Sequence, residues 1–342
     1  MEPTRPATSA SPDARMTAIV HRRYGGPEVL ERVELPRPVP GPGQVLVRVE
    51  AASINSADVR LMAADPFLVR LQFGLRRPRH VRALGRDVAG VVEALGDGAA
   101  RFAVGDRVFG ELTGDSTGAF ADDAVADEGV LAPIPDGVEP TVAAAVPLAG
   151  VTALQAVRDL GRVGPGSEVL VQGAGGGVGG FAVQIAKAYG ATVTASASAA
   201  SGPLVAGYGA DRVVDYATTD VTDEGRTYDV VLGVNGHRSL RAYRRCLRPG
   251  GRYVMVGGEN RQLFAGLLLG RLLVRGDGRS CRVLTIDESR RRDDLAELSD
   301  LLTGGALRPV IDRTFPLADA AEAITYVRGG HVRGKVVLTA TT

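Results

Sequence analysis

The stretch Val169–Gly180, with the sequence VLVQGAGGGVGG, decides the fold of this chain of 342 residues. The apolar residues before the glycines predict a buried strand, and the residues from Gly179 to Tyr189 predict a helix. Two glycine spacings fit the loop: Gly175, Gly177 and Gly180 satisfy GxGxxG, and Gly173, Gly176 and Gly179 satisfy GxxGxxG. A glycine loop between a strand and a helix is the context that a dinucleotide-binding fingerprint requires.

The glycines have separate physical roles in such a loop. One glycine permits the tight turn after the strand, another lets the backbone approach a pyrophosphate, and the last lets the helix pack close to the strand. The first turn of the helix presents unpaired N–H groups and the positive end of the helix dipole to the phosphates. We therefore assign the phosphate contacts to the consecutive residues Gly173, Ala174, Gly175, Gly176, Gly177, Val178 and Gly179.

Apolar strands alternate with helices around the loop. Strands are expected at Glu168–Gln172, Thr192–Ala197, Arg212–Asp215, Asp229–Gly233 and Arg252–Gly257. This alternation predicts a doubly wound parallel sheet over residues 138–280, with a helix at Thr141–Arg158 before it. Because parallel sheets bind ligands at the carboxyl ends of their strands, we expect the nicotinamide half of a dinucleotide beside Gly236, Val256, Gly257 and Gly258.

The end of the second strand bears on the choice between NAD and NADP. NAD-binding proteins usually carry an acidic residue there, which accepts a hydrogen bond from the ribose 2′-hydroxyl. No Asp or Glu occurs between Val193 and Asp211, and the hydroxyls of Ser196 and Ser198 are able to donate to a 2′-phosphate. No Arg or Lys lies in 194–209 to neutralise that phosphate, so the sequence favours NADP and leaves NAD open.

Short strands and glycine turns fill the chain before about Pro135. Strands are expected at Gln44–Ala52, Asp87–Ala94 and Asp106–Phe109, a pattern typical of a β-barrel-like domain. We place this domain at residues 16–137 and complete it with residues 281–342. Residues 1–15 are rich in Pro, Ser, Ala and Thr and are expected to be a disordered tail. The arginine-rich segment Met62–Arg82 is interpreted as a solvated loop or short helix, with a substrate lid as the alternative.

Composition excludes several classes of protein. The formal net charge of +1 argues against a surface built for nucleic acid or for an anionic membrane. The two cysteines, Cys246 and Cys281, lack CxxC spacing, which excludes a disulfide framework and a four-cysteine zinc site and suits a reducing cytoplasm. The four histidines are scattered without ligand spacing, so no metal is expected, and no apolar run is long enough to span a bilayer.

Four further motifs stand beside the glycine loop: Ala52–Asp58 (ASINSAD), Leu84–Gly96 (LGRDVAGVVEALG), Gly209–Tyr216 (GADRVVDY) and Gly334–Leu338 (GKVVL). Together they resemble the zinc-less, quinone-oxidoreductase-like branch of the medium-chain dehydrogenase/reductase superfamily. The resemblance implies an α/β protein with a GroES-like catalytic domain and a Rossmann domain, and an active site in the cleft between them. Zinc-dependent relatives carry a cysteine and a His-Glu pair where this chain has Asn55 and Arg86-Asp87, so the resemblance implies no zinc.

The resemblance also implies an activity, the transfer of hydride from NAD(P)H to a quinone, an enone or a related carbonyl compound. It implies Asn55 as donor to the developing oxyanion, with an asparagine that caps local backbone as the alternative. Asp58 would orient Arg60 or cap the following helix, and Arg60 would lie near the cofactor or on the surface. Tyr216 would lie near the adenosine end or pack internally, and Lys335 would contact phosphate or be a surface lysine.

Two other functions stay open at this point. One is a dinucleotide-binding protein without catalysis, and the other is an enoyl or carbonyl reductase that tailors a bulky product of a biosynthetic pathway. The resemblance further implies a homodimer formed through edge strands of the Rossmann sheets. The apolar segment Cys281–Ile286 is the candidate for that edge.

Overall fold

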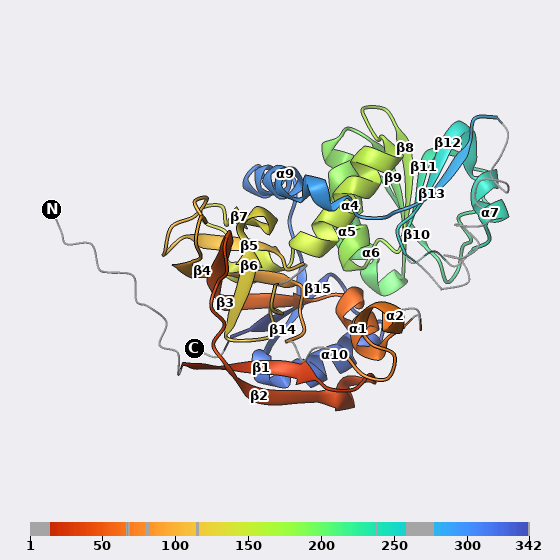
Figure 1. The fold of residues 1–342 in the computed structure, drawn as a ribbon. Helices are drawn as coiled ribbons and strands as arrows, with labels where there is room; N and C mark the ends of the chain where they lie inside the picture. The colour runs from red at the N-terminus through yellow and green to blue at the C-terminus, as the bar shows by residue number, and fades with distance from the viewer. Residues whose placement is uncertain are drawn as a thin grey trace. The chain divides into compact units, whose positions relative to one another are not determined.

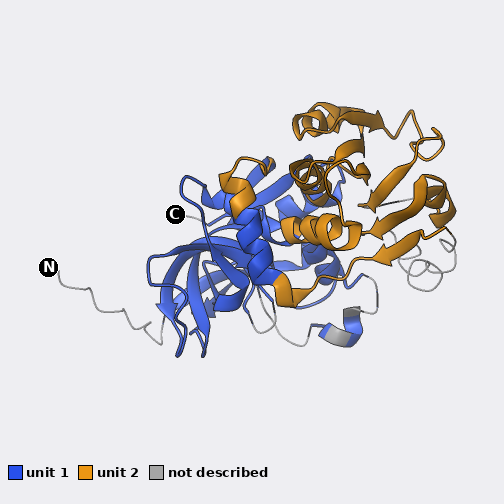
Figure 2. Cartoon of the chain, turned by 90° about the horizontal axis from the view of Figure 1, so that it is seen from above, with its two compact units in different colours: residues 1–148, 291–299, 311–342 blue, residues 149–290, 300–310 orange. Residues whose placement is uncertain are grey.

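The computed structural model describes residues 14–340, apart from 66, 68, 79–82, 114–115, 235, 237 and 258–276. Its chain forms two compact units (Figure 2), of which the first contains residues 1–148, 291–299 and 311–342 and the second contains residues 149–290 and 300–310. Residues 138–148 thus group with the first unit, and residues 281–290 and 300–310 group with the second, which differs from the boundaries expected from the sequence. Most of the expected tail, residues 1–13, lies outside the described residues, and the first strand begins at Arg15.

The first unit is built on a largely antiparallel sheet. Its seven strands have the order β14-β15-β3-β4-β5-β7, with β6 paired to β3, and β1 and β2 form a separate pair. The strands of this unit are β1 (Arg15–His21), β2 (Leu30–Pro36), β3 (Gln44–Ile54), β4 (Asp87–Leu95), β5 (Arg107–Glu111), β6 (Asp123–Asp127), β7 (Leu131–Pro133), β14 (Ile311–Pro316) and β15 (Lys335–Thr339).

Alternation along β3 explains how this sheet buries its core. Val45, Val47 and Val49 point into the main hydrophobic cluster of the unit, while Arg48 stays exposed. Leu46 is also fully buried, although the alternation places it on the opposite face from these valines. Two helices, at Pro140–Ala144 and Ala320–Arg328, contact this strand, so it is more completely buried than the half-buried pattern of the sequence predicts.

The second unit contains a six-stranded parallel sheet with the order β10-β9-β8-β11-β12-β13 (Figure 1). This order confirms the doubly wound sheet, because the chain moves outward in one direction from β8 and then continues on its other side from β11. Its strands are β8 (Glu168–Gln172), β9 (Thr192–Ala197), β10 (Arg212–Asp215), β11 (Tyr228–Gly233), β12 (Leu247–Met255) and β13 (Ser280–Val283).

Helices connect and cover the strands. The α-helices are α1 (Ser56–Ala63), α2 (Val69–Phe73), α3 (Pro140–Ala144), α4 (Pro147–Leu154), α5 (Gly177–Ala188), α6 (Gly202–Gly207), α7 (Leu240–Arg245), α9 (Arg291–Thr303) and α10 (Ala320–Arg328). In the second unit α5 packs on β8 and β9, α6 packs on β10, and α7 packs on β12.

The single helix expected at Thr141–Arg158 is wrong. The structure divides this stretch into α3, α4 and a π-helix at Gln155–Gly161. Pro147 explains the first break, because its ring removes a backbone N–H and cannot continue a helix, whereas it fits the first position of a new one. Pro140 starts α3 in the same way.

Candidate functional site

Two positions of the glycine turn between β8 and α5 have no space for a side chain. Gly173 has φ +71°, and a Cβ there would lie 2.2 Å from the carbonyl oxygen of Val234. A Cβ on Gly179 would lie 2.1 Å from the carbonyl oxygen of Gly173. At Gly176, by contrast, the nearest atom to a Cβ would be 3.8 Å away. The spacing Gly173, Gly176, Gly179 therefore has the three roles of tight turn, open approach and close helix packing.

The N-terminus of α5 is able to hold the pyrophosphate of a dinucleotide. Gly176 is its N-cap in an extended conformation, and no side chain caps the helix. The N–H groups of the first turn have no intrahelical acceptor, and the helix dipole makes this end positive. Because Gly176, Gly177 and Val178 are only half-buried, an anion can reach these groups. The residues present thus fit a dinucleotide.

Two further loop glycines, Gly175 and Gly180, allow the residues that flank α6 to pack against the turn. A Cβ on Gly175 would lie 2.8 Å from the side chain of Ser201, and a Cβ on Gly180 would lie 2.8 Å from the ring of Tyr208. Both neighbours are side chains rather than backbone. The GxGxxG spacing is therefore present in the sequence, but two of its glycines serve packing inside the unit.

The ends of β9 and β10 carry the residues expected at the adenosine half. Ser196 is buried, and its carbonyl oxygen accepts a hydrogen bond from the N–H of Ala174 at 3.1 Å. Ser198 is half-buried and its hydroxyl donates to the hydroxyl of Ser201 at 3.2 Å, while Ala199 is exposed. Tyr216 is 49% exposed, and its N–H donates to the carbonyl oxygen of Ala197. Ser198 and Tyr216 are thus accessible, whereas Ser196 faces the interior.

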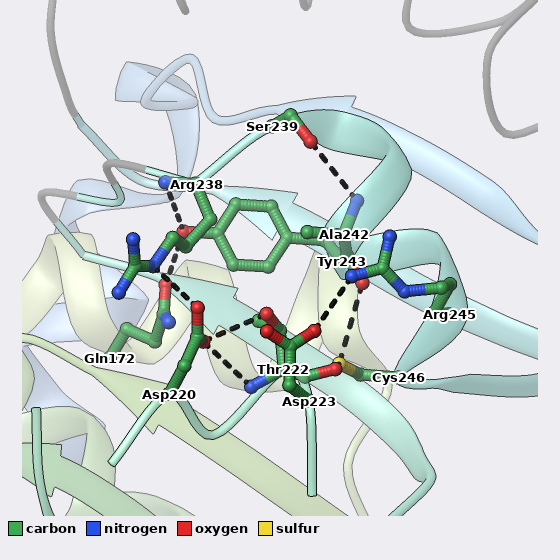
Figure 3. A network of polar contacts seen from close by, with 10 residues as sticks. All are labelled: Gln172, Asp220, Thr222, Asp223, Arg238, Ser239, Ala242, Tyr243, Arg245 and Cys246. Carbon is green, nitrogen blue, oxygen red and sulfur yellow. Dashed lines mark hydrogen bonds and ion pairs between the residues drawn. The ribbon is translucent and has the colours of Figure 1, made fainter. Parts of the chain in front are cut away.

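A network of polar contacts joins the carboxyl end of β8 to α7 through Tyr243, which the sequence did not single out (Figure 3). The hydroxyl of Tyr243 donates to Oε1 of Gln172 and accepts from the N–H of Arg238 at 3.2 Å. Its ring stacks on Tyr253 with centroids 4.4 Å apart. A Cβ on Gly236 would lie 2.8 Å from the Tyr243 hydroxyl, which explains glycine at this position. No sequence signal marked Tyr243, because an aromatic residue in a short helix is ordinarily core.

The remaining residues expected at this end of the sheet follow β12. The N–H of Val256 donates to the carbonyl oxygen of Gly233 at 3.1 Å, and Val256 and Gly257 are both half-buried. Gly258 lies outside the described residues. Val256 therefore lies beside the end of β11, at the carboxyl edge of the sheet. Parallel sheets bind ligands at this edge.

Strand register in the first unit places four polar residues in a row. Val336 of β15 pairs with Ile54 of β3, which brings Lys335 beside Asn55. Ser53 pairs with Asp87 of β4, and Asp87 pairs with Glu111 of β5. One end of four adjacent strands therefore carries an ammonium, an amide and two carboxyl groups. We call Ser53, Asn55, Asp58, Asp87 and Lys335 the polar cluster.

Hydrogen bonds join the polar cluster through Asn55 and Asp87. Nζ of Lys335 donates to Oδ1 of Asn55 at 2.5 Å and lies 3.5 Å from Oδ2 of Asp87. Nδ2 of Asn55 and the hydroxyl of Ser53 both donate to this same carboxylate oxygen at 2.8 Å. The N–H of Leu148 donates to Oδ1 of Asp87 at 2.9 Å. Lys335 is only 4% exposed and Asn55 only 6%, so these contacts are shielded from water.

Asp58, like Asp87, is a fully buried carboxyl group of the cluster. Its Oδ2 accepts from the N–H of Asn55 at 2.8 Å, as the capping alternative for this residue anticipates. Its Oδ1 is buried and has no hydrogen-bond partner among the described residues. Burial raises the pKa of Asp58 to about 7, and the negative charge of Asp87 adds to the rise, while the N–H of Asn55 and the charge of Lys335 oppose it. Arg60 is half-buried on the same helix.

Two more buried ionic groups adjoin the cluster. Glu111 is paired with Arg86 at 2.6 Å and with Arg291 at the start of α9, and the side chains of Glu111 and Arg291 are both buried. Burial raises the pKa of Glu111, and the two arginines oppose that rise. Burial likewise lowers the pKa of Lys335, and Asp87 and Asp58 oppose that shift. The sequence did not indicate Ser53, Glu111 or Arg291, since their neighbours come from distant parts of the chain.

The residues expected in the site fall into the two units. Asn55, Asp58 and Lys335 come together in the first, and the loop glycines, Ser198, Tyr216, Gly236 and Val256 belong to the second. Lys335, which was assigned to phosphate or to the surface, is instead a buried partner of Asn55 within its own unit. Across the described residues, no three His, Cys, Asp or Glu side chains are grouped to hold a metal ion. In the same part of the chain, no helix is long and apolar enough to cross a membrane.

Comparison with known proteins places these features in a family context. The family model described as an alcohol dehydrogenase GroES-like domain matches residues 41–136, and that described as a zinc-binding dehydrogenase matches 208–338. The chain is 31% identical over 337 residues to the chloroplastic quinone-oxidoreductase QR1 of Triphysaria versicolor, an alignment that covers 94% of this chain and 98% of that protein.

Solved structures agree with these sequence relatives. The quinone oxidoreductase from Coxiella burnetii has a TM-score of 0.84 at 28% identity, covering 96% of this chain and 100% of that one. A mycobacterial protein solved in complex with NADPH has a TM-score of 0.78 at 27% identity, covering 95% of this chain and 99% of that one. The GroES-like domain and the Rossmann domain expected from the sequence are thereby confirmed.

Proposed function

The chain belongs to the quinone-oxidoreductase-like branch of the medium-chain dehydrogenase/reductase superfamily, and from this premise we propose that it reduces a quinone, an enone or a related carbonyl compound with NADPH and without zinc. It is an NAD(P)H-dependent oxidoreductase. The observation that carries the proposal is the glycine turn at α5. No side chain caps the helix there, and the space around the Cα of Gly176 is open, so an anion is able to reach the N–H groups. When bound, the reduced nicotinamide supplies the hydride.

The chain's own residues hold the dinucleotide at three places in the second unit. The backbone of Gly173–Gly179 binds the pyrophosphate through the first turn of α5. Ser198 and Tyr216 are accessible at the adenosine half. Gly236 and Val256 leave backbone rather than long side chains at the strand ends beside the nicotinamide half.

NADP is the proposed form of the cofactor. No carboxylate follows β9 that would repel a 2′-phosphate, and the hydroxyl of Ser198 is positioned at the end of that strand. Ala199 and Ala200 are exposed there, so they leave space without adding a positive charge. We therefore expect a preference for NADPH that is modest, since hydrogen bonds alone must recognise the phosphate.

Asn55 is the proposed catalytic residue for the substrate oxygen. Its Nδ2 carries two hydrogens, and Asp87 accepts one of them. The second hydrogen is available to an oxygen that gains negative charge during hydride transfer. The same geometry supports the proposal of zinc-independence, because the ammonium of Lys335 donates to Oδ1 of Asn55 and would repel a metal cation there.

A homodimer in the cytoplasm is the proposed state of the protein. Among the strands that the structure describes, β13 forms one edge of the six-stranded sheet, and an edge strand is able to pair with a second copy. Cys281 lies on this strand and is half-buried in the single chain. Light scattering on the full chain would return the mass of a dimer, whereas the mass of a single chain would contradict this assignment.

The proposed function is tested by cofactor titration followed by turnover. Purified full-length chain is titrated with NADPH and with NADH, and the decay of the reduced nicotinamide is then followed with quinones, enones and aldehydes, with and without a metal chelator. We expect about tenfold tighter binding of NADPH, a difference of about 1.4 kcal/mol. Turnover of a quinone or enone should be unaffected by the chelator.

Each alternative has its own outcome in this test. Tight NADPH binding without turnover of any acceptor would indicate a binding protein rather than an enzyme. Turnover restricted to bulky enoyl or carbonyl compounds would favour a tailoring reductase. A clear preference for NADH would overturn the choice of NADP, and loss of activity with the chelator would overturn zinc-independence.

A further inference from the structure

We propose that Lys335 is a positioning residue for the reaction, which orients and polarises the side-chain amide of Asn55 toward the substrate oxygen. The inference rests on the proposed function, because it requires that Asn55 meets the oxygen of a quinone, enone or related carbonyl. It goes beyond that function because it assigns a role to Lys335, a buried residue that contacts Asn55 and is not among the residues proposed to hold the cofactor.

The choice of lysine at this position is unusual for this chain. Of 40 basic residues only Lys187 and Lys335 are lysines, and the others are arginines. Lys187 is half-exposed and forms an ordinary ion pair with Asp211 at 2.8 Å. Lys335 is buried, where a compact ammonium fits and a broad planar guanidinium would need more space and more acceptors. A chain that otherwise uses arginine thus keeps lysine at a buried position beside Asn55.

The contact fixes which way the Asn55 amide faces. An ammonium only donates hydrogen bonds and a carboxylate only accepts them. Lys335 therefore requires Oδ1 of Asn55 on its side, at 2.5 Å, and Asp87 requires Nδ2 on the other, at 2.8 Å. A flipped amide would put its NH2 group against the ammonium and its oxygen against the carboxylate. The backbone of Asn55 is also fixed, because it is the N-cap of α1 and its N–H donates to Asp58.

The same contact strengthens Asn55 as a donor. A positive charge on Oδ1 draws electron density from the amide, so the N–H groups on Nδ2 become better hydrogen-bond donors. Asp87 accepts one of these hydrogens, and the other remains for the substrate. Because Lys335 and Asn55 are shielded from water, the effect is larger than it would be at an exposed site. Lys335 need not touch the substrate to act.

Several charged groups surround the ammonium and set its titration. Asp87 faces it from β4, Asp58 from α1 and Glu111 from β5. Burial lowers the pKa of Lys335 and these carboxyl groups raise it, with a net shift below the ordinary lysine value. The rate of turnover should therefore fall as alkaline pH removes the proton from Lys335.

A double-mutant cycle tests whether Lys335 acts through Asn55. Lys335→Met, Asn55→Ala and the double variant are compared with wild type for kcat and KM of the quinone or enone. We expect Lys335→Met to lower kcat about 30-fold with KM within about threefold, because the lost interaction matters mainly as charge develops. In the Asn55→Ala background the same substitution should lower kcat less than about threefold. Equal losses in both backgrounds would overturn the proposal.

Lys187→Met is the matched control, since it makes the same substitution at the other lysine of the chain. It should leave kcat and KM unchanged. A purely structural role for Lys335 would give a different pattern, in which Lys335→Met lowers the melting temperature while kcat per folded molecule stays at the wild-type value. That result would also overturn the proposal.

An NMR measurement reports the contact without depending on turnover. The chain has three asparagines, Asn55, Asn235 and Asn260, so selective ¹⁵N-asparagine labelling gives few side-chain amide signals and Asn55→Ala assigns one of them. In wild type the Asn55 amide signal should shift at alkaline pH with the same inflection as kcat. Different inflections, or an unchanged signal, would contradict the proposal even if Lys335→Met fails to fold. Absence of all turnover with a shifting Asn55 signal would instead count against the proposed function.

Discussion

The glycine turn of the second unit and the polar cluster of the first differ in the groups that they present and in how the chain brings those groups together. The turn uses consecutive residues, Gly173–Gly179, and offers backbone N–H groups to the proposed ligand. The cluster uses side chains from β3, α1, β4 and β15, which the chain supplies from residue 53 to residue 335. The turn therefore depends on local geometry, and the cluster depends on correct pairing of distant strands.

The two regions also differ in what would damage them. Any side chain at Gly179 would damage the turn, because its Cβ would overlap the backbone of Gly173. Removal of one charged side chain would damage the cluster, because a buried charge that loses its partner of opposite charge destabilises the fold by several kcal/mol. This contrast leads to predictions that separate steric from electrostatic failure.

The largest effect on cofactor affinity is expected from Gly179→Ala. Its methyl group would meet backbone atoms at 2.1 and 2.7 Å, which cannot move without opening the turn. We expect NADPH affinity to fall at least about 100-fold and the melting temperature to drop, since overpacking of this kind typically costs 1–3 kcal/mol or more. Titration calorimetry and thermal unfolding would measure the two effects.

Gly176→Ala is the matched control within the same turn. Its methyl group would find only Gly173 O, 3.8 Å away, so the melting temperature should stay near wild type. Affinity for NADPH should still fall about tenfold, about 1.4 kcal/mol, because the methyl group occupies the approach to the helix N-terminus. Equal losses of stability in both variants would contradict the separate roles of these glycines.

A pH-dependent effect on stability is expected from Asp58→Asn. Because the pKa of Asp58 is raised to about 7, the folded state keeps a proton that the unfolded state releases above about pH 4. The free energy of unfolding of wild type therefore falls as pH rises from about 4 to about 7. The asparagine does not titrate, so the stability of the variant relative to wild type should rise over this window by up to about 4 kcal/mol.

Denaturant unfolding at several pH values would check this prediction. Asp97→Asn, at an exposed carboxyl group of the same unit, serves as the control and should show no such rise. A difference between Asp58→Asn and wild type that stays constant from pH 4 to pH 7 would show that Asp58 does not hold its proton in the folded state.

The smallest effect is expected from Ala199→Arg. This exposed position follows β9, where a guanidinium would supply the positive charge that residues 194–209 lack. A charge-assisted contact with a 2′-phosphate should raise the preference for NADPH over NADH by about tenfold, with little change in NADH affinity. The ratio of the two dissociation constants measures it. An unchanged ratio would place the 2′-position of the ribose elsewhere.

The sequence predicted the second unit more closely than the first. The strands β8, β9 and β10 have the bounds expected from their apolar patterns, since buried parallel strands are short, continuous and bounded by turns. The single helix expected at Thr141–Arg158 is wrong because Pro147 starts a new helix within an otherwise continuous apolar pattern. Asn55 and Asp58 could be chosen from their motif, but the partners of Lys335 could not.

By itself, the sequence determined the glycine turn between β8 and α5, because strand, glycines and helix are contiguous and their geometry is local. Only the tertiary structure decided the environment of Lys335. Antiparallel pairing of β15 with β3 brings a residue near the C-terminus onto Asn55, 280 positions away, and buries both. Strand register across such a separation follows from the packing of the whole unit, so no local pattern around GKVVL could show that its lysine is an internal partner of the site.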